Sequence, residues 1–181
     1  MVNAHRRLSW WLVLLAVAVT APAVRAQSAP TDYRDEFLAH FGRSSMKMTQ
    51  LSAAVPESLY TWSPGEGVMS IAQVYMHIAR YNYLYLDGSF GIEAPDGVDW
   101  QDFESITDKE TIVAALRASI AHVRKAAGAM TEDDLTRRMP LYGQEVPGWA
   151  VLFQLLSHMN EHVGQSIAYA RMNDIVPPWS R

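Results

Sequence analysis

Hydrophobic side chains recur every three to four residues in four segments of the chain, and no segment shows a convincing alternation of apolar and polar positions. A spacing near 3.6 residues is typical of amphipathic helices, whereas a spacing of two is typical of strands. The predicted helices cover residues 31–56, 70–88, 107–130 and 147–173. Four such helices predict an all-α fold, a four-helix bundle, over residues 31–176.

Signals at the segment ends support these helices. Thr31 is a good N-cap with acidic residues directly after it. Ser70 and Thr107 each precede a glutamine or glutamate by three residues, which is the spacing of a capping box. Gly88 is expected to close the second helix, and Pro147 suits the first position of the fourth.

Two connections are long. Residues 89–106 carry glycine and proline and predict a long crossover between the second and third helices. A connection of that length in a compact domain is usually functional or contains a short helix. Residues 131–138 predict a polar turn, and a further segment, 140–147, precedes the fourth helix.

The first 26 residues predict a cleaved signal peptide. Residues 5–7 are basic, residues 10–19 are apolar, and residues 24–26 have the small-x-small form of a cleavage site. The apolar stretch is short for a membrane span, which needs about 20 residues, so no stable membrane anchor is expected after cleavage. An uncleaved anchor is the alternative. The protein is therefore expected in the periplasm or secreted.

Composition narrows the function classes. Cleavage would remove three of the 15 basic side chains and no acidic one, leaving 12 against 19 and a net charge near −7. An acidic chain without a basic stripe is a poor candidate for binding nucleic acid. The chain has no cysteine, so a lipoprotein anchor, disulfides and thiolate ligands are excluded. About 150 residues remain, enough for one domain with an adequate core.

Three histidines form a candidate metal site. His158 and His162 are four residues apart in an apolar helical segment, so their side chains share one helix face. His77 lies beside the apolar stripe of the second predicted helix. Together they could hold one divalent ion and leave a coordination position open. Core or surface histidines at a coincidental spacing are the alternative.

Neighbouring residues limit this interpretation. Met159 stands where a zincin would carry its general base, so the chain is not a zincin. Glu161 is expected to point outward or to support the ligands from behind. His122 is expected to face solvent, and His40 to lie toward one end of the bundle rather than to bind metal.

The second predicted helix also carries a run of aromatic side chains. They could line a pocket together with Trp100, but ordinary core and rim packing is the favoured reading. The run consists of Tyr81, Tyr83 and Tyr85.

Two stretches around these histidines resemble the DinB-like superfamily of metal-dependent enzymes. The segment from Trp62-Ser63-Pro64 to Ser70-Ile71-Ala72-Gln73 and on to His77-Ile78-Ala79 is similar to the family's entry to its second helix. The segment His158-Met159-Asn160-Glu161-His162-Val163-Gly164-Gln165 is similar to its H-x-x-x-H-x-G-Q motif. With a short tail at Pro177 and Pro178, the resemblance covers about Tyr33 to Trp179.

The resemblance implies a four-helix bundle with nickel or zinc held by one histidine of the second helix and two of the fourth. Those positions are His77, His158 and His162. Val163 stands where the family usually has arginine, which puts substrate or local stability in doubt. Characterised members of the family lean to transfer reactions with low-molecular-weight thiols, and many others have no known substrate.

The expected function is therefore an exported metal-dependent enzyme that acts on an unknown small molecule. Water on such an ion can ionise near neutral pH, which predicts a hydrolase, and thiol binding predicts a thiol-dependent transferase. Export argues against a cytosolic thiol cosubstrate. Tyr81 and Gln165 are candidates for orienting ligands or substrate. The alternatives are a non-catalytic metal-binding or structural bundle, and a bundle that binds a small molecule without metal. A homodimer stays open.

Overall fold

The structure is a computed structural model that describes residues 33–180. The predicted signal peptide and the predicted N-cap Thr31 lie outside the described residues. Among the described residues, no helix is both long and apolar enough to cross a membrane. The elements are α1 (Tyr33–Ala54), α2 (Ile71–Phe90), α3 (Lys109–Ala129), α4 (Glu132–Thr136), β1 (Arg138–Leu141), β2 (Gln144–Pro147) and α5 (Gly148–Met172), with single 3-10 turns at Glu57–Leu59, Phe103–Ser105 and Pro178–Ser180.

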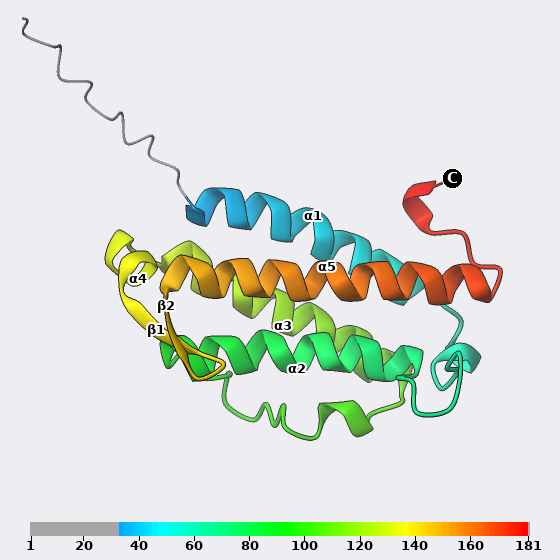
Figure 1. Cartoon of the computed structure of the whole chain (residues 1–181). Coiled ribbons are helices and arrows are strands. Elements are labelled where there is room, and N and C mark those ends of the chain that lie inside the picture. Colours follow the sequence, from blue (N-terminus) through cyan, green and yellow to red (C-terminus); the bar gives the residue numbers. More distant parts are fainter. Residues whose placement is uncertain (1–32, 181) are drawn as a thin grey trace, which may run out of the picture. The chain divides into compact units, whose positions relative to one another are not determined.

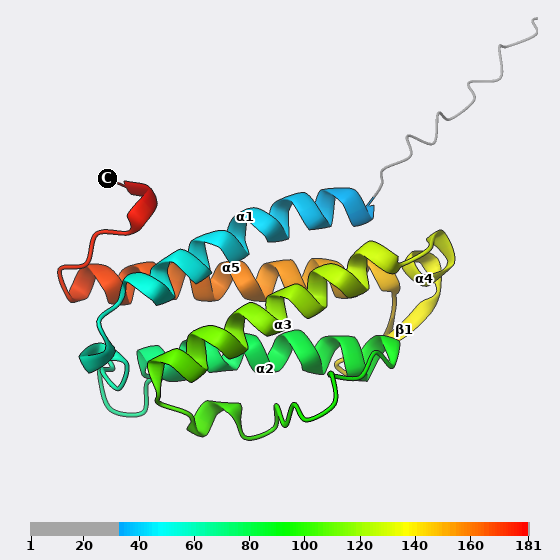
Figure 2. The same cartoon turned by 180° about the vertical axis from the view of Figure 1, so that it is seen from behind.

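The four long helices form a bundle in which α1 and α2 each pack against both α3 and α5. The prediction of an all-α bundle with a long crossover is confirmed. Residues 91–108 run back along the outside of α2, so α2 and α3 point the same way while α1 and α5 point the other way (Figure 1, Figure 2). This path carries crossover residues past the first half of α2.

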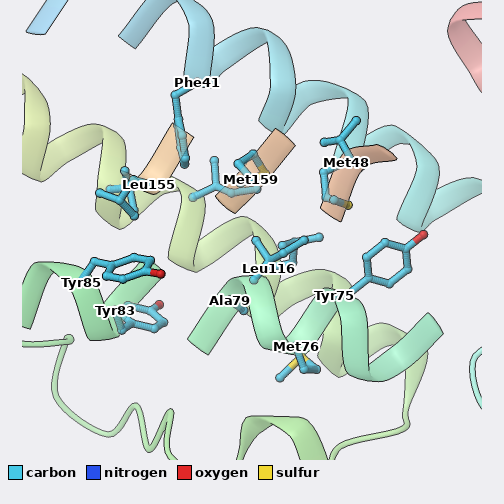
Figure 3. Packing of buried hydrophobic residues seen from close by; sticks show 14 of the residues in the cluster. Phe41, Met48, Tyr75, Met76, Ala79, Tyr83, Tyr85, Leu116, Leu155 and Met159 are labelled. Carbon is cyan, nitrogen blue, oxygen red and sulfur yellow. The ribbon is translucent and has the colours of Figure 1, made fainter. Parts of the chain in front are cut away.

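Apolar stripes of the four helices meet in one core. Figure 3 shows labelled side chains from all four helices meeting between them, while Met76 points from α2 to the opposite side; all the labelled ones are fully buried or nearly so. Burying one large aliphatic or aromatic side chain contributes about 1.5–3 kcal/mol. Each long helix contributes buried side chains to this cluster, among them Phe41 from α1, Met76 from α2, Leu116 from α3 and Met159 from α5.

Two predicted helix ends are corrected. The capping box at Ser70 is confirmed, since its side chain accepts from the backbone N–H of Gln73. Gly88, however, stays within α2, and Gly91 closes that helix with φ of 66°, the left-handed conformation that glycine adopts without strain. The N-cap of α3 is Asp108 rather than Thr107, because the Asp108 carboxylate accepts from the backbone N–H of Thr111 at 2.8 Å.

The segment from 131 to 147 holds a short helix and a β-hairpin that the periodicity did not predict. Strands β1 and β2 pair antiparallel, with Leu141 opposite Gln144. Tyr142 and Gly143 form the two-residue turn, with φ of 51° and 75°. Positive φ at both turn positions is typical of the type I′ hairpin. Ser89 fixes the hairpin to α2 by donating to the carbonyl oxygen of Pro140 at 2.7 Å.

Candidate metal centre

The three histidines selected from the sequence lie together between α2 and α5. One ring nitrogen from each lies within 4.8 Å of the others. The ring centroid of His77 lies 5.1 Å from that of His158 and 4.9 Å from that of His162, and the centroids of His158 and His162 are 4.6 Å apart. Helices α2 and α5 therefore bring together side chains that are about 80 residues apart in the sequence.

The spacing suits a shared ion after small side-chain rotations. Nitrogens bound tetrahedrally to zinc at about 2.0–2.1 Å lie roughly 3.3 Å apart. The Nε2 atoms of His158 and His162 are 3.2 Å apart already. The nitrogen of His77 is within 4.8 Å of them, so it has at most about 1.5 Å to close. The donor set fits a borderline-soft divalent ion such as zinc or nickel.

A carboxylate backs the first histidine. Glu104 Oε1 lies 2.9 Å from His77 Nδ1, and Arg80 Nη1 donates to the same oxygen at 3.3 Å. A carboxylate only accepts, so Nδ1 carries the hydrogen and the Nε2 lone pair of His77 is left for a cation. The Arg80 Nε atom is buried and has no hydrogen-bond partner among the described residues.

A side-chain amide backs the second histidine in the same way. Gln165 Oε1 lies 2.7 Å from His162 Nδ1, and Gln165 Nε2 donates to the Tyr169 hydroxyl at 2.9 Å. The bond to Tyr169 orients the amide, so its carbonyl faces the histidine. Nδ1 of His162 is therefore the donor, and its Nε2 lone pair faces His158.

Burial keeps the pair of histidines on α5 uncharged at neutral pH. It lowers the pKa of His158 to about 3, with smaller contributions from His162 and His77. Burial also lowers the pKa of His162, opposed in part by the hydrogen bond that His162 Nδ1 donates to Gln165 Oε1. Neutral imidazole is the form that binds metals. Two neutral ring nitrogens 3.2 Å apart repel unless a proton or a cation lies between them.

Aromatic rings form one wall of the cluster. The Tyr81 ring centroid lies 4.4 Å from that of His77 and 4.9 Å from that of His158. Tyr85 stands edge-on to His158 at 5.8 Å. The favoured reading of this run as core packing is right for Tyr83, which is buried, but half-buried Tyr81 lies against the histidines. Any role of Tyr81 or Gln165 in orienting a substrate stays a prediction.

The remaining expectations have mixed outcomes. Glu161 is exposed, which agrees with the outward alternative, and His40 is exposed, lies 3.7 Å from Glu36 and is outside the cluster. The prediction that His122 faces solvent is wrong, because its Nε2 atom is buried and its ring lies 5.1 Å from that of Tyr83. Sequence reasoning also missed Glu104. The only signal was the length of the crossover, whose single 3-10 turn contains this residue.

We expect Glu104→Gln to weaken metal binding by about 10–100-fold, the usual cost of losing an outer partner of a ligating histidine. The amide can still accept a hydrogen bond from His77 Nδ1–H. It lacks the negative charge of the carboxylate, which makes the Nε2 atom a stronger ligand for the metal. Glu93→Gln is the matched control, since Glu93 is an exposed glutamate of the same crossover. Competition titration against a metallochromic chelator measures both. Equal affinities in the two variants would contradict a supporting role for Glu104.

Comparisons with known proteins agree with this fold. A family model described as the DinB superfamily matches residues 40–167. No curated protein matches the chain at a significant level.

Solved structures give the same result. A DinB-like protein from Bacillus cereus superposes with a TM-score of 0.70 at 21% identity, covering 80% of this chain and 95% of that one. A DinB-like protein from Bacillus subtilis gives 0.56 at 18% identity, with coverages of 78% and 94%. A mycothiol-dependent maleylpyruvate isomerase gives 0.58 at 15% identity, covering 72% of this chain and 59% of the isomerase. At these identities the likeness concerns the fold.

Proposed function

Because the chain belongs to the DinB superfamily, we propose that it is an exported metal-dependent enzyme whose zinc or nickel ion is held by His77, His158 and His162. Its substrate would be a small molecule with a group that reaches the open coordination position. The observation that carries the proposal is the convergence of three imidazoles from α2 and α5 at one point.

The composition of the cluster favours a catalytic site over a closed structural one. Among the described residues, the cluster contains three potential metal ligands, and all three are histidines. The carboxylate of Glu104, which contacts His77, is engaged with the Nδ1 atom of that ring and with Arg80. Catalytic zinc sites have three protein ligands and one position for water or substrate, whereas structural sites have four protein ligands.

The protein's own groups set the chemistry available at that position. Three neutral imidazoles leave the full +2 charge of a bound ion, which lowers the pKa of a coordinated water or thiol. Glu104 and Gln165 hold two of the rings in the tautomer that presents Nε2. Tyr81 covers one side of the cluster with an aromatic ring and so shields it from water.

Between the two reactions, we favour thiol activation. The mycothiol-dependent isomerase is a thiol-dependent enzyme on a similar fold, and this supports the choice by analogy only. Hydrolysis is the second candidate, because the same site could activate water and because export would separate the protein from cytosolic thiols. The negative charge of the mature chain supports a small-molecule substrate rather than nucleic acid.

One preparation tests location, metal and reaction class together. Protein collected from the periplasm or the medium should begin at Gln27 and carry about one equivalent of zinc or nickel. After exchange with Co²⁺, a small thiol such as 2-mercaptoethanol should produce an intense sulfur-to-cobalt band below 400 nm. Hydrolysis of activated esters without such a band would favour the hydrolase instead. If removal of the metal lowers the melting temperature, and the bound metal takes up neither a thiol nor exchangeable water, the site is structural.

A further inference from the structure

Three polar side chains next to the histidine cluster form a hydrogen-bonded group with no formal charge. The hydroxyls of Tyr85 on α2 and Tyr142 at the hairpin tip bond to each other. Gln154 on α5 donates from Nε2 to Tyr85 at 3.3 Å and, more weakly, to Tyr142 at 3.5 Å. Residues from three elements that are far apart in the sequence therefore meet at one point.

The group has hydrogen-bonding capacity left over. Its four polar hydrogens are two on the Gln154 amide and one on each phenol. The amide uses its two on the phenol oxygens, and one phenol donates to the other. With Nε2 turned toward the phenols, the Gln154 carbonyl oxygen accepts from neither of them, so one phenolic hydrogen has no acceptor within the group. Burial first, and then the bond to Tyr142, raise the pKa of Tyr85, so its hydroxyl keeps its hydrogen at neutral pH.

The group adjoins the candidate metal centre. Tyr85 stands edge-on to His158 at 5.8 Å, and its ring lies 5.5 Å from that of Tyr81, which covers His77. On its other side Tyr85 lines, with Tyr142 and Ser89, a cavity of about 190 Å³ between α2 and the hairpin. A path of aromatic rings thus leads from the histidines to the hairpin tip.

The backbone at Tyr142 adopts a strained conformation. Its φ of 51° is uncommon for a bulky side chain, and glycine or asparagine would suit the turn better. The side chain is 67% exposed, so burial does not compensate the strain. Strained residues of this kind cluster at functional sites.

We propose that Tyr85, Tyr142 and Gln154 form a substrate subsite that donates a hydrogen bond to an uncharged oxygen, such as an amide, ester or ketone carbonyl. Another group of the same molecule would occupy the open position at the three histidines. A carboxylate is disfavoured here because the group offers no positive charge to a partly desolvated anion. The inference rests on the proposed function, since it assumes a metal ion at the histidines.

The test uses Co²⁺-loaded protein and two matched series of thiols. One series is N-acetyl aminoalkanethiols with two, three or four methylenes between sulfur and amide. The other replaces the amide N–H by methylene and the carbonyl oxygen by methyl. At one length at least, we expect the amide thiol to bind about 5–10-fold more tightly than its hydrocarbon isostere, the value of one neutral hydrogen bond. Tyr85→Phe and Tyr142→Phe should each reduce that preference to less than twofold.

Two further variants separate recognition from stability. Tyr33→Phe is the control, because Tyr33 is exposed and stacks on Trp149, and it should keep the preference. Tyr142→Gly removes the phenol at a turn position that suits glycine, so the variant should still show a cooperative urea transition and should lose the preference. No preference at any length, or one that survives both phenylalanine substitutions, overturns the subsite while the metal centre stands. Failure of the unmodified protein to bind Co²⁺ overturns the proposed function and the subsite with it.

Discussion

His158→Ala should lower the affinity of the protein for Zn²⁺ by at least about a thousandfold, well beyond the 10–100-fold cost of an outer partner. His158 is the most buried of the three candidate ligands and lies within 3.2 Å of His162. Its removal leaves one imidazole on each of two helices, which cannot enclose an ion. Competition with a chelator of known affinity measures the loss, and elemental analysis should find far less than one equivalent.

The control for this variant is His40→Ala. His40 is also helical, but it is exposed on α1 and lies outside the cluster, so one equivalent of metal should remain. His162→Ala should lower the metal affinity as His158→Ala does. Agreement between the two variants would show that the loss does not come from misfolding caused by one substitution. Unfolding in urea without metal checks that each variant is folded. If the two substitutions on α5 bound metal as tightly as the His40 variant, the three-histidine centre would be wrong.

The clustering of the three histidines could be predicted from the sequence because each step of the inference depended on local rules. Residues four apart on a helix share a face, which paired His158 with His162. The apolar stripe of the second predicted helix placed His77 near its core-facing side. Two amphipathic helices in a bundle must bury those stripes against neighbours, and packing α2 against α5 then joins the three rings.

The parts that were missed depend on contacts that no local rule contains. Glu104 reaches His77 only because the crossover returns along α2, so that a single 3-10 turn faces the second turn of that helix. His122 is covered because Tyr83 packs on it from α2. Neither the direction of the crossover nor the partner of a helix face is encoded in a hydrophobic period.

The hairpin was missed for a different reason. Pro140 and Pro147 lie within its short strands, and proline cannot donate to a strand ladder, so it argues against strands. A two-stranded ribbon has open edges that tolerate proline. Tyr142-Gly143 was the remaining signal, but hairpin turns of this type favour asparagine or aspartate before the glycine. Tyr142 therefore occupies a turn position that its bulky side chain does not favour.

Without metal, the protein should lose stability as the pH falls from about 6.5 toward 3. His158 in an unfolded chain takes up a proton near its ordinary value of 6.5, whereas burial lowers its pKa to about 3 in the folded protein. In that interval the unfolded state binds more protons, so acid favours unfolding. One such group changes the free energy of unfolding by at most about 1.4 kcal/mol per pH unit. The lowered pKa of His162 acts with the same sign.

Urea unfolding in the presence of EDTA, at half-unit steps from pH 4.5 to 7.5, measures this dependence. His158→Gln removes the titrating group while keeping a side chain of similar size, so its stability should fall less steeply below pH 6.5. The same substitution at exposed His40 controls for loss of a histidine outside the cluster, and the steep slope should survive it. Saturating Zn²⁺ should steepen the acid dependence of the unmodified protein, because protons then compete with the ion for the same nitrogens. A slope that is identical in the protein and in His158→Gln would show that this histidine is not held neutral by the fold.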